Sequence, residues 1–389
     1  MAFDAYGRLA PRPGMRLAVV GGGISGLSAA WLLSQAHSVT LYEREARFGG
    51  HANTVEAPVA GGSVPVDAGF IVYNEPAYPN LTALFEHLGV ASQTACMSFG
   101  ASIDAGAVEY SGQTLSSVFA DRRNLVSPRF WRMLVDVARF HRDARRALAE
   151  GVAHDVSLND FIAARGYSCA FADWFLRPMA SAIWSTPSAR ILDFSAAAFI
   201  KFYDNHGLLQ VLNLPTWRTV SGGARAYVEK MAGPLRANAR LNVAVASVRR
   251  VEGGVTVVDA QGRADRFDAV VLACHADQAL AMLGDADARE RAVLGAFRYH
   301  KNRAFVHKDA AQMPRRRRAW SSWNYLGGSE GFSATYWMNR LQNLSCAENV
   351  FVSLNPQTPI RDDAIVAEFD YDHPMFDVGA EKAQREIWS

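Results

Sequence analysis

One short stretch limits what this chain can fold into more than any other segment: "LAVVGGGISGLSAAWLL", residues 17–33. An apolar run stops in glycine and restarts as an Ala/Leu-rich stretch, which predicts a buried strand, a tight turn and a helix. Gly21, Gly23 and Gly26 place the spacing G-x-G-x-x-G at that turn. The first glycine permits the turn, the second lets the backbone approach a pyrophosphate, and the third lets helix and strand pack closely. The stretch therefore predicts a turn that holds a dinucleotide.

An acidic residue follows at the spacing that such a site needs. The next predicted strand, "SVTLYE", ends at Glu43, which lies 17 residues past Gly26. Its carboxylate can accept hydrogen bonds from the two hydroxyls of a ribose. The helix start supplies free amide groups for the phosphates at Ile24 and Ser25. These features are typical of NAD-binding and FAD-binding folds alike, so at this point both cofactors stay open.

Composition argues against several other classes of protein. The 389 residues suffice for two domains or one large interleaved one. The four cysteines, Cys96, Cys169, Cys274 and Cys346, form no C-x-x-C pair, so we predict no metal site and no disulfide framework, in a reducing cytoplasm. A net charge of +2 and the lack of a reader motif argue against nucleic-acid binding. No apolar run reaches the roughly 18–20 residues of a membrane span, and nothing indicates a particular oligomeric state.

A second glycine turn follows the acidic residue. The segment "EREARFGGH", residues 43–51, resembles the extended motif of flavoproteins in the amine oxidase and phytoene desaturase-like superfamily. Further stretches extend the resemblance in the order of that superfamily: "VDAGFIVYN" (66–74), "RTVSGGARAYVEKMA" (218–232), "LNVAVASVRRV" (241–251) and "DAVVLACHA" (268–276). The resemblance implies FAD as the cofactor. Besides the first glycine turn, it implies that FAD contacts Glu43, Arg44, Arg47, Gly49, Gly50, Asp67, Gly69, Phe70, Gly222, Gly223, Val245 and Ala273.

The fold that the resemblance implies is α/β. We expect a Rossmann-like FAD-binding domain of the glutathione reductase type, interleaved with a substrate domain of mixed sheet and helices. The expected parts are a flexible leader (1–14), the FAD-binding domain (15–90 and 211–295) and the substrate domain (91–210 and 296–389). The superfamily closes with a C-terminal flavin-contacting segment that we do not find up to residue 389, so we expect this chain to be truncated.

Aromatic segments outside the predicted FAD-binding domain are candidates for a substrate pocket. Each aromatic residue by itself fits an ordinary core, but the cluster favours a hydrophobic substrate. The expected pocket residues are Trp184, Tyr203, Trp217, Trp323, Tyr325 and Tyr336. The expected catalytic residues are His206 as general base, with Tyr73 and Asp204 as further candidates. Lys201 and Lys301 are candidates for the water-holding lysine of amine oxidases, although neither lies in a recognisable motif.

Two stretches are both basic and aromatic. Residues 128–149 contain six arginines with Phe130 and Trp131, and "MPRRRRAW" (313–320) contains four consecutive arginines next to a tryptophan. Basic residues next to apolar anchors are typical of a peripheral membrane contact, although solvated surfaces explain them as well. The predicted localisation is therefore cytoplasmic, with contact to the inner face of the membrane.

Within the superfamily, "DNHGLLQV" and "YDHPMFD" look most like a bacterial subgroup that resembles the flavoproteins of furan fatty acid synthesis. This resemblance implies dehydrogenation of a methyl-branched fatty acyl chain of a phospholipid, by hydride transfer to flavin N5. Two alternatives stay open: a flavin amine oxidase that acts on a small or lipidic amine, and a non-catalytic flavin-binding protein.

Overall fold

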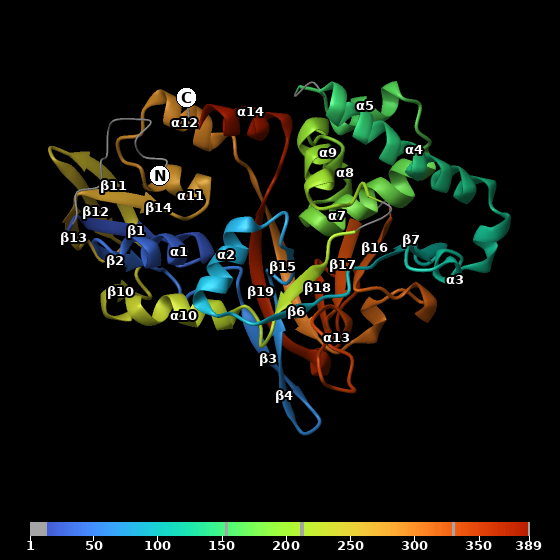
Figure 1. The fold of residues 1–389 in the computed structure, drawn as a ribbon, viewed down its shortest axis with the longest axis horizontal. Helices are drawn as coiled ribbons and strands as arrows, with labels where there is room; N and C mark the ends of the chain where they lie inside the picture. Colours follow the sequence, from blue (N-terminus) through green and yellow to red (C-terminus); the bar gives the residue numbers. More distant parts are fainter. Residues whose placement is uncertain (1–13, 152–154, 211–213, 329–330, 388–389) are drawn as a thin grey trace. The chain divides into compact units, whose positions relative to one another are not determined.

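The structure is a computed structural model of the chain, and it describes residues 14–151, 155–210, 214–328 and 331–387 (Figure 1). The chain divides into two compact units, each built from two segments. Unit 1 comprises Met1–Asn53 and Ala224–Ala296, and unit 2 comprises Thr54–Gly223 and Phe297–Ser389. The leader expected over 1–14 lies outside the described residues except for Gly14.

Unit 1 begins as strand, helix, strand and, in its second segment, has a run of strands between helices. Its elements are β1 (Arg16–Val20), α1 (Ile24–Leu33), β2 (Ser38–Tyr42), α10 (Arg225–Leu235), η4 (Arg236–Asn238), β10 (Ala239–Arg240), β11 (Val245–Val251), β12 (Gly254–Asp259), β13 (Ala264–Phe267), β14 (Ala269–Leu272), α11 (Ala276–Met282) and α12 (Ala288–Gly295).

A parallel sheet in the order β10–β2–β1–β14 forms the centre of unit 1. Residues 17–20 of β1 are all buried, as expected for a parallel strand that is covered on both faces. A second, antiparallel sheet, β11–β12–β13, packs through Val248, Val257 and Phe267 against Tyr42. The helix predicted after the glycine turn is α1, and the segment 268–276 of the flavoprotein resemblance contains β14, which is half-buried.

Unit 2 is larger. Its first segment contains β3 (Thr54–Val59), β4 (Gly62–Asp67), β5 (Tyr73–Asn74), α2 (Pro79–Leu88), β6 (Ser92–Thr94), β7 (Phe99–Ile103), β8 (Val108–Ser111), α3 (Leu115–Val118), η2 (Arg122–Val126), α4 (Pro128–Glu150), α5 (Leu158–Ala164), α6 (Cys169–Phe171), η3 (Ala172–Leu176), α7 (Arg177–Trp184), α8 (Ser188–Ile191), α9 (Ala196–Asn205) and β9 (Trp217–Val220). Its second segment contains β15 (Tyr299–His307), η5 (Ala310–Gln312), η6 (Arg317–Ala319), β16 (Trp323–Gly328), β17 (Gly331–Trp337), α13 (Met338–Leu341), β18 (Phe351–Leu354), η7 (Asp362–Ala364), β19 (Ile365–Pro374) and α14 (Val378–Glu386).

A mixed sheet in the order β19–β15–β18–β17–β16–β7–β8 joins the two segments of unit 2. The β16–β7 pair is parallel and the other neighbouring pairs are antiparallel. Helices α4 to α9 form a separate apolar core around Phe140, whose ring contacts those of Phe161, Phe171 and Tyr203. Among the described helices, none is both long and apolar enough to cross a bilayer.

The unit boundary differs from the one expected from the sequence. Residues 54–90 and 211–223, which the sequence analysis assigns to the FAD-binding domain, belong to unit 2. The reason is packing: Val66, Ala68 and Ile71 share one hydrophobic core with the seven-stranded sheet. Strand β9 also pairs with β5 and β6 of the same unit.

Candidate functional site

The first glycine turn has no room for side chains at two of its three positions. Gly21 has φ +106°, and a Cβ there would lie 2.6 Å from the carbonyl oxygen of Ala273. A Cβ on Gly26 would lie 1.8 Å from the carbonyl oxygen of Gly21. At Gly23, by contrast, a Cβ meets no heavy atom of the described chain within 4 Å. The turn is therefore closely packed at Gly21 and Gly26, and it leaves open space next to Gly23.

The second glycine turn lies directly against the first. The amide of Gly49 donates to the carbonyl of Gly22 at 2.8 Å, and Gly49 also bridges to Gly23. A Cβ on Gly50 would lie 3.2 Å from the Cα of Gly23. Arg47 donates to the carbonyl of Gly50 at 3.0 Å and so closes this loop on itself.

Glu43 is buried between these turns and β10. Its Oε2 accepts from the amide of Gly22 at 2.6 Å and its Oε1 from the amide of Glu45 at 2.8 Å. A carboxylate has about four acceptor positions, so two remain for a ribose. The neighbouring Arg44 is exposed and pairs with Glu45, and the amide of Val243 donates to the carbonyl of Glu43.

These features fit a dinucleotide. Helix α1 starts at Gly23 without a side-chain cap, so the amides of Ile24 and Ser25 in its first turn are available to an anion. The strand expected to contact adenine begins at Val245, directly after the backbone that bonds to Glu43. Each of these contacts to a cofactor stays a prediction.

The remaining residues expected at the cofactor belong to unit 2. Asp67 is buried, and its carboxylate accepts from Thr54 Oγ1 at 2.6 Å and from Gln342 Nε2 at 2.8 Å. Gly223 has φ +86°, and a Cβ there would lie 2.9 Å from Asp67 Oδ1. Asp67 therefore bonds β4 to Thr54 of β3 and to Gln342, and its carboxylate lies close to Gly223. Gly222, by contrast, is exposed with open space above it.

A cavity of about 520 Å³ lies within unit 2. Its wall includes Trp217, Trp323 and Tyr336, three of the aromatic residues expected at a substrate pocket, and also Gly69 and Phe70. Methionine, aromatic and branched aliphatic side chains make up most of the rest. Among the described residues that line it, none is Asp, Glu, Lys or Arg.

The other three expected pocket aromatics lie in the hydrophobic cores instead. Trp184 packs on Phe199 with ring centroids 5.1 Å apart, and Tyr203 stacks on the same Phe199 at 4.4 Å. Tyr325 stacks on Phe332 within the large sheet. Trp184 on α7 and Tyr203 on α9 fill the helical core, and Tyr325 lies two residues farther along β16 than the cavity residue Trp323. Aromatic content does not reveal these positions.

His206 is the expected catalytic residue that reaches the cavity. It caps α9, and its Nδ1 lies 2.8 Å from the carbonyl oxygen of Phe202. A carbonyl only accepts, so Nδ1 carries the proton and Nε2 is the acceptor nitrogen of the neutral ring. The ring stacks on Phe202 with centroids 3.8 Å apart. Burial lowers the pKa of His206 below its ordinary value, against the opposing effect of the Phe202 carbonyl, so the ring is neutral near pH 7.

The other catalytic candidates do not line the cavity. Tyr73 is buried edge-on against Phe85, and Asp204 is exposed on α9. Lys201 on α9 and Lys301 on β15 are exposed as well.

The structure adds a second histidine to the cavity, His373 on β19. The amide of Arg303 donates to Asn355 Oδ1 at 3.0 Å, so Asn355 Nδ2 faces Asn302 Oδ1, at 2.5 Å. Asn302 Nδ2 then donates to His373 Nδ1 at 2.9 Å. The neutral ring of His373 therefore carries its proton on Nε2, opposite to His206. Tyr371 and His373, two apart in "YDHP", share one strand face, and that spacing is the sequence signal for them.

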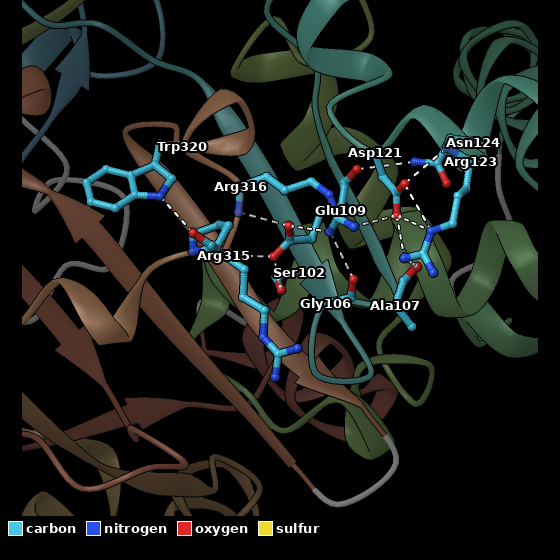
Figure 2. A network of polar contacts seen from close by, with 11 residues as sticks. Ser102, Gly106, Ala107, Glu109, Asp121, Arg123, Asn124, Arg315, Arg316 and Trp320 are labelled. Carbon is cyan, nitrogen blue, oxygen red and sulfur yellow. Dashed lines mark hydrogen bonds and ion pairs between the residues drawn. The ribbon is translucent and has the colours of Figure 1, made fainter.

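The arginine run 315–318 is anchored rather than free. Arg316 bonds to the buried carboxylates of Glu109, at 2.8 Å, and Asp121, at 3.1 Å. The amides of Arg315 and Arg316 also donate to Glu109, and Figure 2 shows these groups converging on its carboxylate. Arg317 stacks over the ring of Trp320 at 3.7 Å. On α4, Arg139 pairs with the buried Asp136.

The fold and the site define a mixed α/β protein with a dinucleotide-type double glycine turn in one unit and an uncharged apolar cavity in the other. The profile of the family described as flavin containing amine oxidoreductase matches residues 24–331, and the chain belongs to this family. It is an FAD-dependent oxidoreductase, and its cofactor is FAD.

Solved structures of similar fold include three enzymes. Putrescine oxidase with putrescine bound has a TM-score of 0.65 at 16% identity, covering 95% of this chain and 90% of that chain. A fatty acid isomerase from P. acnes that produces CLA has a TM-score of 0.65 at 16% identity, covering 95% and 89%. Cyclohexylamine oxidase from Brevibacterium oxydans IH-35A has a TM-score of 0.66 at 15% identity, covering 95% and 90%. At these identities the likeness shows the fold alone. The comparison with curated proteins returns no match.

Proposed function

We propose that the enzyme dehydrogenates an uncharged, hydrophobic substrate in the unit 2 cavity, and that this substrate is a methyl-branched fatty acyl chain of a phospholipid. The observation that carries the proposal is the absence of Asp, Glu, Lys and Arg among the described residues lining the cavity. A cationic amine would lose its hydration there without gaining a counter-ion, which is unfavourable by several kcal/mol. An alkyl chain gains about 0.8 kcal/mol for each CH₂ that it buries.

The residues of the cavity suit the removal of a proton from such a chain. FAD, when bound, supplies the two-electron oxidant for C–H cleavage. His206, neutral because burial lowers its pKa, offers Nε2 as the proton acceptor. His373 offers an N–H donor of opposite polarity. The apolar wall excludes water from the reacting carbons.

Two observations connect this cavity to FAD and to lipids. Gly69 and Phe70 line it, and the resemblance to flavoproteins assigns them to the segment beside the flavin ring. One structure of similar fold is a fatty acid isomerase, so the fold is compatible with a fatty acyl substrate. Putrescine oxidase has a similar fold, which supports the alternative function of this enzyme as a flavin amine oxidase.

Anaerobic reduction of the flavin distinguishes the two readings. The purified holoenzyme is mixed with a methyl-branched unsaturated phosphatidylcholine in detergent micelles, or with putrescine or cyclohexylamine, and the flavin absorbance near 450 nm is followed. We expect bleaching by the lipid alone. Ile183→Glu, which places a carboxylate in the wall, should abolish the response to lipid, whereas Val251→Glu on an exposed strand should not. Bleaching by the amines alone would reject the proposal.

A further inference from the structure

The exposed apolar side chains of this protein are concentrated in one short segment. Of the ten large hydrophobic residues that are exposed among the described residues, five lie between residues 115 and 135. They are Leu115 (81% exposed), Leu125 (43%), Val126 (84%), Trp131 (47%) and Val135 (52%). Exposed apolar side chains scattered singly are ordinary, but a concentration of this kind marks a contact surface.

The same segment is strongly basic. Residues 115–135 contain four arginines, all of them exposed, and one acidic residue, Asp121, which is buried. Asp121 is occupied by Arg123 at 2.7 Å and Arg316 at 3.1 Å. Arg132 pairs with the buried Asp136 at 3.1 Å. Among the described residues, Arg122 and Arg129 are therefore the two arginines of the segment that no carboxylate pairs with.

The buried ion pairs bring the second basic stretch to this surface. Because Arg316 reaches inward to Glu109 and Asp121 (Figure 2), it holds the 315–318 run beside α3 and η2. Arg315, Arg317 and Arg318 are left exposed. Farther along α4 the pattern ends, since Arg142 and Arg146 are paired with Asp143 and Glu150.

Trp131 is held in a fixed position on this surface. Its Nε1 donates to the carbonyl of Leu125 at 3.0 Å, and its ring packs against Phe119 at 5.4 Å. A rigid tryptophan with one apolar face and one satisfied N–H is typical of the region between lipid headgroups and acyl chains.

We propose that this amphipathic surface, formed by residues 115–135 and 315–318, docks the protein on an anionic lipid bilayer. On this surface, exposed apolar side chains alternate with arginines that no described carboxylate pairs with, among them Arg122, Arg315 and Arg318. Such a surface complements a negatively charged membrane, where the apolar side chains enter the headgroup layer and the arginines meet phosphates. Binding to the phosphate backbone of a nucleic acid would not explain the five exposed aliphatic and aromatic side chains of this surface.

The surface is continuous with the wall of the cavity. Tyr110, Gly112 and Gln113 line the cavity, and Leu115 follows two residues after Gln113. Gln113 Nε2 also donates to Ser321 Oγ at 3.0 Å, just beyond the arginine run. That the membrane supplies the acyl substrate rests on the proposed function, whereas the docking surface itself does not.

Vesicle binding tests the docking surface. The holoenzyme is mixed with phosphatidylcholine vesicles, with or without phosphatidylglycerol, and bound protein is measured by flotation. We expect binding only with phosphatidylglycerol, weakened by salt. Leu115→Ser/Val126→Ser should bind at least about tenfold more weakly. Arg122→Gln/Arg315→Gln/Arg318→Gln should bind about 100-fold more weakly, since each basic residue next to an anionic surface contributes roughly fivefold.

Matched variants elsewhere are the controls. Leu214→Ser/Val251→Ser removes two other exposed apolar side chains, and Arg236→Gln/Arg249→Gln/Arg385→Gln removes three other exposed arginines. Both should bind as the unchanged protein does. Absence of binding, equal binding by all variants, or equal loss in the controls overturns the proposal. The proposal is also overturned if sedimentation velocity shows that the protein is a dimer and that the Leu115→Ser/Val126→Ser variant is a monomer.

The acyl-chain assay in micelles keeps the two proposals separate. Vesicle binding without flavin reduction by any acyl substrate rejects the proposed function and leaves the docking surface standing. Flavin reduction by micellar substrate without vesicle binding rejects the docking surface alone.

Discussion

Replacing Gly23 by alanine should weaken FAD binding and leave the stability of the protein without its cofactor nearly unchanged. Gly23 has φ −69°, a conformation open to any residue, and a Cβ there meets no heavy atom of the described chain within 4 Å. Gly→Ala restricts the unfolded chain, which favours folding by about 0.4–1 kcal/mol. Gly23 is the N-cap of α1, where alanine is disfavoured relative to glycine, so the two effects should nearly cancel. The open space above Gly23 is where the pyrophosphate of the cofactor should lie.

The effect on FAD follows from the amides that the methyl group would displace from the phosphate. Moving the phosphate away from the start of α1 weakens one or two charged hydrogen bonds, each contributing about 1.5–3 kcal/mol. A loss of about 2–3 kcal/mol corresponds to a roughly 30- to 150-fold rise in Kd. Gly26→Ala differs in kind, because its Cβ would lie 1.8 Å from the Gly21 carbonyl oxygen, and it should damage the fold itself.

Urea unfolding of the apoprotein and titration with FAD, followed by flavin fluorescence, measure the two effects separately. Gly233→Ala is the matched control, since Gly233 lies within α10 of the same unit and also has open space around its Cβ. It should stabilise the apoprotein by up to about 1 kcal/mol and leave FAD affinity unchanged. If Gly23→Ala keeps the full affinity for FAD, the pyrophosphate does not lie above Gly23, and the assignment of the glycine turn is refuted.

Three further predictions concern unit 2. Glu109→Gln should destabilise the protein by about 3 kcal/mol in urea unfolding, because Arg316 loses a buried carboxylate partner. The control Glu150→Gln, in an exposed ion pair, should change the free energy of unfolding by less than about 0.5 kcal/mol. Equal effects of the two variants would contradict a stabilising role of the Glu109–Arg316 pair. Burial lowers the pKa of His307 to about 4, so at acid pH the unfolded state binds a proton that the folded state does not. As the pH falls from about 6.5 to about 4, the free energy of unfolding should therefore decrease by about 1.4 kcal/mol per pH unit, roughly 3 kcal/mol in all. His307→Gln should remove this pH dependence. If the pH dependence is unchanged in that variant, groups other than His307 cause it. His206→Gln should lower the rate of flavin reduction about 100-fold or more. Because burial lowers the pKa of His206, the wild-type enzyme should keep its activity near neutral pH and lose it only below the ordinary histidine pKa. A loss of activity near pH 7 would exclude His206 as the base.

The parts of the molecule that could be predicted from sequence are those fixed by neighbours in the chain. Gly21 and Gly26 form one turn, and α1 and β2 follow within the next sixteen residues, so the spacing alone determines the arrangement. Glu43 directly follows β2, at the strand end that the sequence predicts. Ser127 caps α4 as a serine before a long amphipathic helix should.

The cavity depends on contacts between distant segments, and there composition is a poor guide. Trp184 and Tyr203 belong to helices whose apolar faces meet one another, so their rings fill the helical core. Trp323 and Tyr325 are two residues apart on β16, yet only Trp323 lines the cavity. The proton position of His373 could not be predicted, because it depends on a chain of amides that begins at residue 303.

Charge rather than shape must decide what this enzyme oxidises. Putrescine oxidase and the fatty acid isomerase have the same TM-score against this chain, so the fold does not separate amines from acyl chains. Leaving one ammonium unpaired in the cavity would lose several kcal/mol, which burial of at least about four CH₂ groups would be needed to offset. Putrescine has four CH₂ groups for two ammonium groups, and cyclohexylamine has only about as many CH₂ groups as one ammonium requires, whereas an acyl chain has many and carries no charge along its length. Under the proposed function, His206 and His373 would favour an acyl chain over an amine because they supply hydrogen bonds but no negatively charged counter-ion.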